Sequence, residues 1–203
     1  LIDQPMMAAV LADLAIESEA ATALSMRLAQ TFDQEDPLGR LLTPIAKYWV
    51  CKRAPGMVYE AMEALGGAGY VETGPMPRLC RRSPENAIWE GSGNVIALDG
   101  LRAVDREPEA VAALQGFLET SRGRDVVYDA WLDGLDFAPV SEAKTRLVVE
   151  RLALAAQAAV LLTNESPVAG AFCRLRLLPR GAAYGAFEAK IDAAGILERA
   201  LPA

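Results

Sequence analysis

The chain has 203 residues, of which 52% are hydrophobic and 23% are charged, and its formal net charge is −7. This acidic balance argues against general affinity for nucleic acids, which requires clustered positive charge. No stretch reaches the roughly twenty apolar residues that a membrane-spanning helix needs, and the chain does not start with a secretory signal pattern. We therefore expect a cytoplasmic globular protein that has no membrane anchor.

Cysteine and histidine content excludes several kinds of site. Cys51, Cys80 and Cys173 are widely spaced and odd in number, which predicts reduced thiols rather than a disulfide framework. The sequence contains no histidine. A zinc site and a Ser-His-Asp triad are therefore not expected, and we predict no metal site.

The first predicted helix runs from Pro5 to about Gln30, because proline is well accepted in the first turn of a helix. Apolar residues recur every seven positions along it, which is typical of the seam of a helical bundle. This predicted seam contains Met7, Leu14, Ala21 and Leu28. The opposite face contains Asp13, Glu17, Glu19 and Arg27, and we interpret Glu17 and Glu19 as solvated carboxylates.

A second long helix is predicted from Leu38 to Leu65, after a polar turn that ends in Pro37. The glycines of residues 66–69 are predicted to end it. A small basic patch lies along this helix and consists of Lys47, Lys52 and Arg53. We interpret the patch as solvated helix surface, and phosphate contact is the alternative.

The rest of the chain also follows a helical pattern. A short turn carries three arginines, Arg78, Arg81 and Arg82. Arginine can bind phosphate, but ion pairs within the bundle are the favoured interpretation here. Further helices are predicted over residues 92–105, 109–121, 125–135, 141–162, 168–178 and 191–201.

No alternating strand pattern of useful length is present. We therefore predict an all-α fold: an up-down four-helix bundle with additional C-terminal helices. The boundary is placed at Arg106-Glu107-Pro108, so residues 1–106 would form the bundle and residues 107–203 a helical C-terminal extension.

Residues 64–101 contain two features that lie about twenty residues apart. The first is Gly66-Gly67-Ala68-Gly69, and glycine lets a backbone come close to a ligand. The second is Trp89-Glu90-Gly91-Ser92-Gly93-Asn94, in which a large ring adjacent to a carboxylate can raise the carboxyl pKa by desolvation toward that of a general base. Taken separately, a glycine cluster usually only ends a helix, and a lone Glu is usually exposed.

Together these two features resemble the C-terminal helical domain of the acyl-CoA dehydrogenases. In that family an aromatic-Glu-Gly-Thr/Ser segment carries the catalytic base, and a Gly-Gly-x-Gly segment approaches the flavin dinucleotide of a neighbouring subunit. The upstream LLTPIAKYWVCKRAP and the long helical tail are most similar to the AidB-like branch, which is linked to the adaptive response to DNA alkylation. The resemblance covers Leu1 to about Val104 and is looser beyond.

The resemblance implies α,β-dehydrogenation of an acyl-CoA thioester, with FAD as the hydride acceptor. It identifies Glu90 as the catalytic base, and Trp89 and Gly91 as part of the substrate pocket, where Trp89 would desolvate the carboxylate. It also implies a set of FAD contacts: Glu63, Gly66, Gly67, Ser92 and Asn94. Glu63 stands where many members have Gln, and its carboxylate would repel the FAD pyrophosphate.

The resemblance also implies a homo-oligomer, a dimer or tetramer, because a neighbouring subunit completes the flavin site. The family's N-terminal helical and middle β domains, which hold most of the flavin and the acyl-CoA, have no counterpart in these residues. We therefore expect a fragment that is inactive by itself. Two alternatives stay open: a DNA-associated protection protein and a helical oligomerisation domain. The first would use Arg174, Arg176 and Arg180, although the acidic charge predicts weak DNA binding or none.

Overall fold

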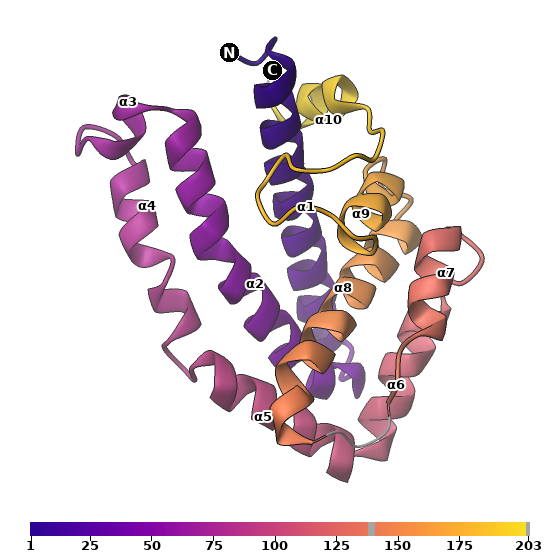
Figure 1. Cartoon of the computed structure of the whole chain (residues 1–203). Helices are drawn as coiled ribbons and strands as arrows, with labels where there is room; N and C mark the ends of the chain where they lie inside the picture. The colour runs from indigo at the N-terminus through magenta and orange to yellow at the C-terminus, as the bar shows by residue number, and fades with distance from the viewer. Residues whose placement is uncertain (138–140, 202–203) are drawn as a thin grey trace.

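The computed structural model describes residues 1–137 and 141–201, and within them every regular element is a helix (Figure 1). The elements are α1 (Pro5–Asp33), α2 (Leu38–Ala64), α3 (Gly67–Tyr70), α4 (Met76–Arg82), η1 (Glu85–Ala87), α5 (Gly93–Arg106), α6 (Pro108–Glu119), α7 (Val126–Asp133), η2 (Glu142–Lys144), α8 (Thr145–Thr163), α9 (Ala169–Arg176) and α10 (Ala193–Ala200). The all-α prediction is confirmed. Positions 138–140 and 202–203 of the predicted extension lie outside the described residues.

The predicted helix limits agree closely with the observed ones, but two segments differ. The predicted turn that carries Arg78, Arg81 and Arg82 is helix α4. Residues 66–69 were predicted only to end the second helix, but Gly67–Tyr70 form the short helix α3. The second helix contains two prolines within its length, Pro44 and Pro55. Neither proline ends α2, although each removes a backbone donor from the helix.

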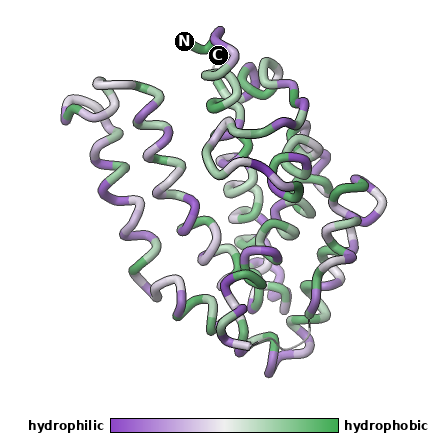
Figure 2. The backbone as a smooth tube through the Cα atoms, in the orientation of Figure 1, coloured by the Kyte–Doolittle hydropathy of each residue, from purple (hydrophilic) through white to green (hydrophobic). Residues whose placement is uncertain are grey.

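The core is formed where α8 packs against α1, α2 and α5. Residues 152–162 of α8 are all buried, which fits a helix that is hydrophobic on every side. The indole Nε1 of Trp49 on α2 donates to the Oε1 of Gln157 on α8 at 2.9 Å, so both buried polar groups are satisfied. Hydrophobic segments gather where α1 and α8 meet, whereas hydrophobic and hydrophilic residues alternate along α4 (Figure 2).

Helix α1 buries a different stripe from the predicted seam. Of that seam, Leu14 is buried, whereas Met7, Ala21 and Leu28 are half-buried. Helices α2, α8 and α10 pack against α1, so its buried face is wider than a heptad seam. The buried residues recur every four positions, as in ridges-into-grooves packing. The fully buried stripe consists of Ala12, Ile16, Ala20 and Leu24.

The interpretation of Glu17 as a solvated carboxylate is wrong, and Asp13 beside it is also buried. Their exposed fractions are 4% and 0%. The guanidinium of Arg176 on α9 lies 2.6 Å from Asp13 and 2.8 Å from Glu17, and Arg53 on α2 lies 2.9 Å from Glu17. Arg180 lies 3.0 Å from Asp13. These charges are buried because they neutralise one another.

The segment between α9 and α10 crosses α1 at this cluster (Figure 1). The Gly185 N–H donates to Asp13 Oδ2 at 2.9 Å, and the Tyr184 ring lies 5.2 Å from the Arg53 guanidinium carbon. Glu19, the other carboxylate interpreted as solvated, is half-buried and pairs with Arg199 of α10 at 2.9 Å. Ion pairs therefore join the extension to α1, and the contact of Tyr184 with Arg53 joins it to α2.

The C-terminal half of α2 forms, with α3 and α4, an arm that projects from the core (Figure 1). The buried residues of α2 lie between Leu38 and Trp49, in the half that faces the core. The arm exposes several large hydrophobic side chains: Tyr59, Leu65, Tyr70, Val71 and Leu79.

We expect the fold to lose stability in acid through Asp13 and Glu17. Burial raises the pKa of each carboxyl, but the surrounding arginines outweigh it, so each pKa lies below its ordinary value of 3.8 or 4.5. A carboxyl with a lowered folded-state pKa stabilises the fold above the unfolded-state pKa, and this stability is lost as pH falls. The unfolding free energy, measured with urea at a series of pH values, should therefore decrease below about pH 4.5.

The variant Glu17→Gln should lower the unfolding free energy at pH 7 by about 3 kcal/mol, because it takes a buried carboxylate away from the half-buried Arg53 and from the buried Arg176. It should also lose less stability in acid than the parent does. Glu19→Gln, in a more exposed pair, is the control and should cost less than about 1 kcal/mol. Equal losses in the two variants would contradict the assignment of the buried cluster.

Candidate functional site

The segment between η1 and α5 forms a turn that carries the predicted base. Glu90 has φ 55° and Gly91 has φ 122°, so two consecutive residues adopt left-handed conformations. Such a conformation costs a non-glycine residue about 1 to 2 kcal/mol. Gly91 therefore suits its φ, and a Cβ built there would lie 2.8 Å from the Cδ1 of Ile96, so a side chain would also have to displace the end of Ile96.

This turn rests on one face of α2. The Lys47 ammonium donates a hydrogen bond to the carbonyl oxygen of Asn86. Between α2 and the turn lies a void of about 10 Å³, too small to be a ligand pocket. The void is lined by Lys47, Tyr48, Cys51, Lys52, Ala87, Gly91, Gly93 and Ile96.

The side chains of the turn face outward. Glu90 is exposed, Trp89 is 54% exposed and Ile88 is 66% exposed. An apolar ring therefore lies next to the carboxylate in sequence, as predicted, but the described part of this chain does not enclose them. The predicted desolvation of Glu90 requires a surface beyond these residues.

Ser92 and Asn94 flank the start of α5. Ser92 has extended dihedral angles and precedes the first helical residue, but its hydroxyl makes no capping hydrogen bond. Asn94 is exposed and borders a surface cavity of about 230 Å³ that Glu142 and Arg146 also line. Both polar side chains are therefore accessible to a ligand.

The glycine segment forms the junction of α2 and α3. Gly66 ends α2 with φ 60°, and a Cβ built on Gly66 or Gly67 meets no heavy atom within 4 Å. Glu63, one turn earlier, is exposed. A Cβ on Gly69 would instead lie 2.1 Å from the Met62 carbonyl oxygen. Gly66 and Gly67 thus leave open backbone, whereas Gly69 is needed to seat α3 on α2.

The structure separates the predicted site residues into two groups. Trp89, Glu90, Gly91, Ser92 and Asn94 lie together at the start of α5, near the base of the arm (Figure 1). Glu63, Gly66 and Gly67 lie at the tip of the arm, where α2 passes into α3. Helix α4 runs between the two groups, so the described residues do not bring them into one pocket.

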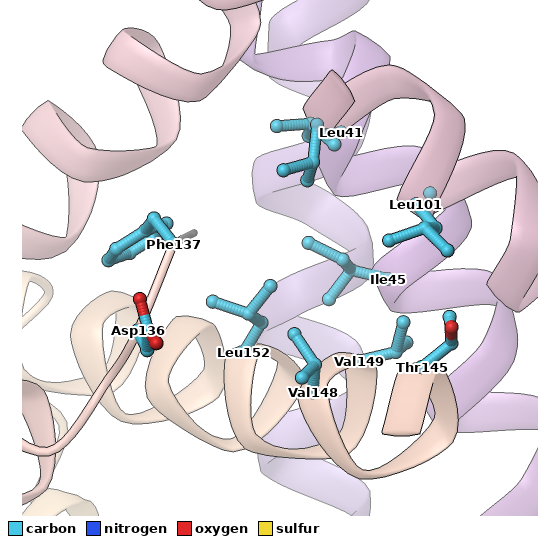
Figure 3. A pocket seen from close by; sticks show the side chains of 11 residues that line it. Leu41, Ile45, Leu101, Asp136, Phe137, Thr145, Val148, Val149 and Leu152 are labelled. Atoms are coloured by element: carbon cyan, nitrogen blue, oxygen red, sulfur yellow. The ribbon is translucent and has the colours of Figure 1, made fainter. Parts of the chain in front are cut away.

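A third region, remote from both groups, contains an apolar cavity between α2, α5 and α8 (Figure 3). Its volume of about 20 Å³ is that of a packing void rather than a substrate pocket. None of the predicted site residues lines it. The labelled lining residues include Leu41, Ile45, Leu101, Val148, Val149 and Leu152.

The basic residues singled out in the sequence have varied surroundings. Arg81 pairs with Glu72 at 2.6 Å, as the ion-pair interpretation predicts, and Arg78 and Arg82 are exposed. The suggestion that Arg176 and Arg180 belong to a positive surface is wrong, because both pair with the buried Asp13. These neutralised charges could not be found from sequence, since their partners lie more than 160 positions away.

Within the described residues, no cluster of three or more His, Cys, Asp or Glu side chains could hold a metal ion. The three cysteines are free thiols. In the same residues, no helix combines the length and the apolar character needed to cross a membrane.

Comparisons with known proteins agree on one family. Residues 1–104 match the family model described as the acyl-CoA dehydrogenase C-terminal domain. The chain is 38% identical over 189 residues to the putative acyl-CoA dehydrogenase AidB of Escherichia coli (strain K12), covering 89% of this chain and 35% of that protein.

Two solved structures are similar to the chain. The apo-form of Bd2924 has a TM-score of 0.69 at 30% identity, over 79% of this chain and 34% of that one. Caenorhabditis elegans ACDH-11 in complex with C11-CoA also has a TM-score of 0.69, at 23% identity, over 84% of this chain and 36% of that one, and this likeness shows the fold alone. The chain thus spans about a third of the length of these relatives.

The contrast between the glycines gives a prediction about the arm. Gly69→Ala should lower the unfolding free energy by about 1 to 3 kcal/mol, because its Cβ must displace the Met62 carbonyl. Amide hydrogen exchange across α3 should also become faster. Gly67→Ala, which fills open space, is the matched control and should change stability by less than about 1 kcal/mol. A tolerated Gly69→Ala would show that α3 is not seated as described.

Proposed function

Because the chain belongs to the acyl-CoA dehydrogenase family through its C-terminal domain, we propose that it is part of a flavin-dependent enzyme that dehydrogenates acyl-CoA thioesters. Glu90 is the proposed catalytic base. The observation that carries this proposal is the turn itself, in which a left-handed glutamate, held on α2, projects its carboxylate outward beside Trp89. A carboxylate so placed can reach a substrate bound against this face.

In this proposal Glu90 removes the proton from the carbon next to the thioester carbonyl. FAD, when bound, supplies the acceptor for the hydride that leaves the neighbouring carbon. Trp89 and Ile88 provide apolar surface beside the carboxylate, so that substrate and the remainder of the enzyme can exclude water there. Loss of water disfavours the charged carboxylate and makes it a more effective base.

The residues present fit FAD in part. The open backbone at Gly66 and Gly67 leaves room for a close approach by a pyrophosphate. The uncommitted Ser92 hydroxyl and the exposed Asn94 amide can donate hydrogen bonds to the same cofactor. The exposed Glu63 carboxylate would repel a phosphate, so we place it at the edge of the site rather than against the pyrophosphate.

We further propose that the enzyme is a homo-oligomer, a dimer or tetramer. The separation of Gly66 and Gly67 from the Glu90 turn supports contact between the glycine pair and the FAD of a neighbouring subunit. The exposed apolar side chains of the arm, among them Tyr70 and Leu65, support burial of the arm in the assembly. Residues 1–106 are the part proposed to be common to the family, and residues 107–203 its extension.

Isolated from the rest of the enzyme, the chain is proposed to be inactive. Glu90 and Trp89 are open to solvent in the described structure, so nothing here excludes water from the reaction. A helical oligomerisation domain is the alternative that keeps the arm but assigns no chemistry to Glu90.

Glu90→Gln tests the base in the full-length, FAD-loaded enzyme. Because Gln has nearly the same shape but cannot accept a proton, the variant should retain FAD and bind acyl-CoA. Bleaching of the oxidised flavin on addition of acyl-CoA, followed by stopped-flow absorbance, should slow by at least about 100-fold. Glu85→Gln, in the exposed η1 turn, is the control and should bleach near the parent rate. Parent-like bleaching in Glu90→Gln would place the base elsewhere.

DNA protection is the other alternative, and the charges give it less support. The net charge is −7, and the ion pairs of Arg176 and Arg180 leave the exposed Arg174 as the remaining member of that proposed surface. We expect weak DNA binding or none, with a dissociation constant above about 1 μM near physiological salt in a fluorescence anisotropy titration. Tighter binding with a steep salt dependence would favour the DNA alternative.

A further inference from the structure

Glu90 differs from the two other non-glycine residues that have positive φ in the described chain, Glu35 and Glu165. Glu35 follows α1, where the next N–H returns to the Thr31 carbonyl at 2.9 Å. Glu165 follows α8 in the same way, with a 2.9 Å bond from Ser166 to Leu161. Both are the left-handed residues that normally end an α-helix. No bond of this kind spans Glu90 among the described hydrogen bonds, so its left-handed conformation has a different origin.

The segment just before Glu90 makes a hydrogen bond with α2. In η1 the N–H groups of Ile88 and Trp89 both donate to the Glu85 carbonyl, at 2.9 and 3.1 Å. The next acceptor in line is the Asn86 carbonyl, which the Glu90 N–H would use if a helical turn continued. The described hydrogen bonds give that carbonyl to the Lys47 ammonium. The Glu90 N–H makes no bond to that carbonyl among the described hydrogen bonds, so the helical path ends at Trp89.

The far side of the turn is held by packing. Gly91 has φ 122°, a conformation that favours glycine, and a side chain at this position would approach Ile96 of α5. The stem of Lys52, which lines the same void as Lys47, lies over Gly93, where a built Cβ would be 2.5 Å from its Cε. The turn thus has a hydrogen bond to α2 before Glu90 and passes close to Ile96 and Lys52 after it.

We propose that Lys47 is a positioning residue for Glu90: by holding the Asn86 carbonyl, its ammonium directs the chain out of η1 into the left-handed Glu90–Gly91 turn. The position of the Glu90 carboxylate then depends on α2 as well as on the turn. The expected effect of Lys47 on the reaction rate rests on the proposed function. The expected effect of Lys47 on the conformation of the turn does not.

Lys47→Met tests the proposal in the full-length, FAD-loaded enzyme, because Met keeps an apolar stem of similar length but has no donor. The rate of flavin bleaching at saturating acyl-CoA should fall at least about tenfold, since a small displacement of a base slows the chemical step. The KM and the FAD content should stay near parent values. Lys47→Arg, which restores a donor, should recover most of the rate.

Lys52→Met is the matched control. It removes the same charge beside the same void but keeps an apolar stem over Gly93 and removes no hydrogen bond to the Asn86 carbonyl, so its bleaching rate should stay near that of the parent. An equal loss in Lys52→Met would assign the effect to charge and overturn the proposal. Parent-like bleaching in Lys47→Met would also overturn it.

Hydrogen exchange followed by mass spectrometry separates this proposal from the proposed function. Peptides that cover residues 85–93 should exchange faster in Lys47→Met than in the parent or in Lys52→Met. If Glu90→Gln bleaches normally, the base assignment fails, and the exchange of this segment alone decides whether Lys47 holds the turn. Unchanged exchange in Lys47→Met would refute the positioning role whatever the chemistry of Glu90.

Discussion

The packing of α2 is the constraint on which both the core and the site depend. Its first half is buried against α1, α5 and α8, and Trp49 joins it to α8 through Gln157. Its second half leaves the core and supports the arm. Lys47 and Lys52 lie where the two halves meet, so the helix that completes the core also supports the Glu90 turn. A displacement of α2 would therefore disturb core packing and the proposed base together.

The ion-pair cluster around Asp13 and Glu17 performs a different task. Burying two carboxylates costs several kcal/mol per ion before their partners are counted, so a hydrophobic contact would stabilise this interface more simply. The charges instead specify geometry, because Arg176 must reach two acceptors on successive turns of α1. These ion pairs favour one register of the extension on α1, because apolar contacts alone tolerate small shifts along the helix.

The sequence was sufficient for most of the helices, but not for long-range electrostatics. Helix limits follow from proline, glycine and apolar periodicity, which act over a few residues. The grouping of Trp89, Glu90 and Ser92 is likewise local. Glu17 was misassigned because a carboxylate on a polar face has the same pattern whether or not Arg53 and Arg176 approach it. The bond from Lys47 to Asn86 was missed for the same reason, as it joins positions 39 residues apart.

The exposure of Glu90, the proposed catalytic base, is consistent with a site that several parts of an enzyme complete. A glutamate buried by this chain alone would be costly and closed to substrate, whereas one held rigidly at the surface can become desolvated when substrate and neighbouring surfaces cover it. Rigidity then has to come from the backbone, since no described side chain encloses Glu90. The left-handed turn between Lys47 and Ile96 can supply it for the backbone, because the hydrogen bond to Asn86 and the close passage at Ile96 limit where the Glu90 Cα can lie.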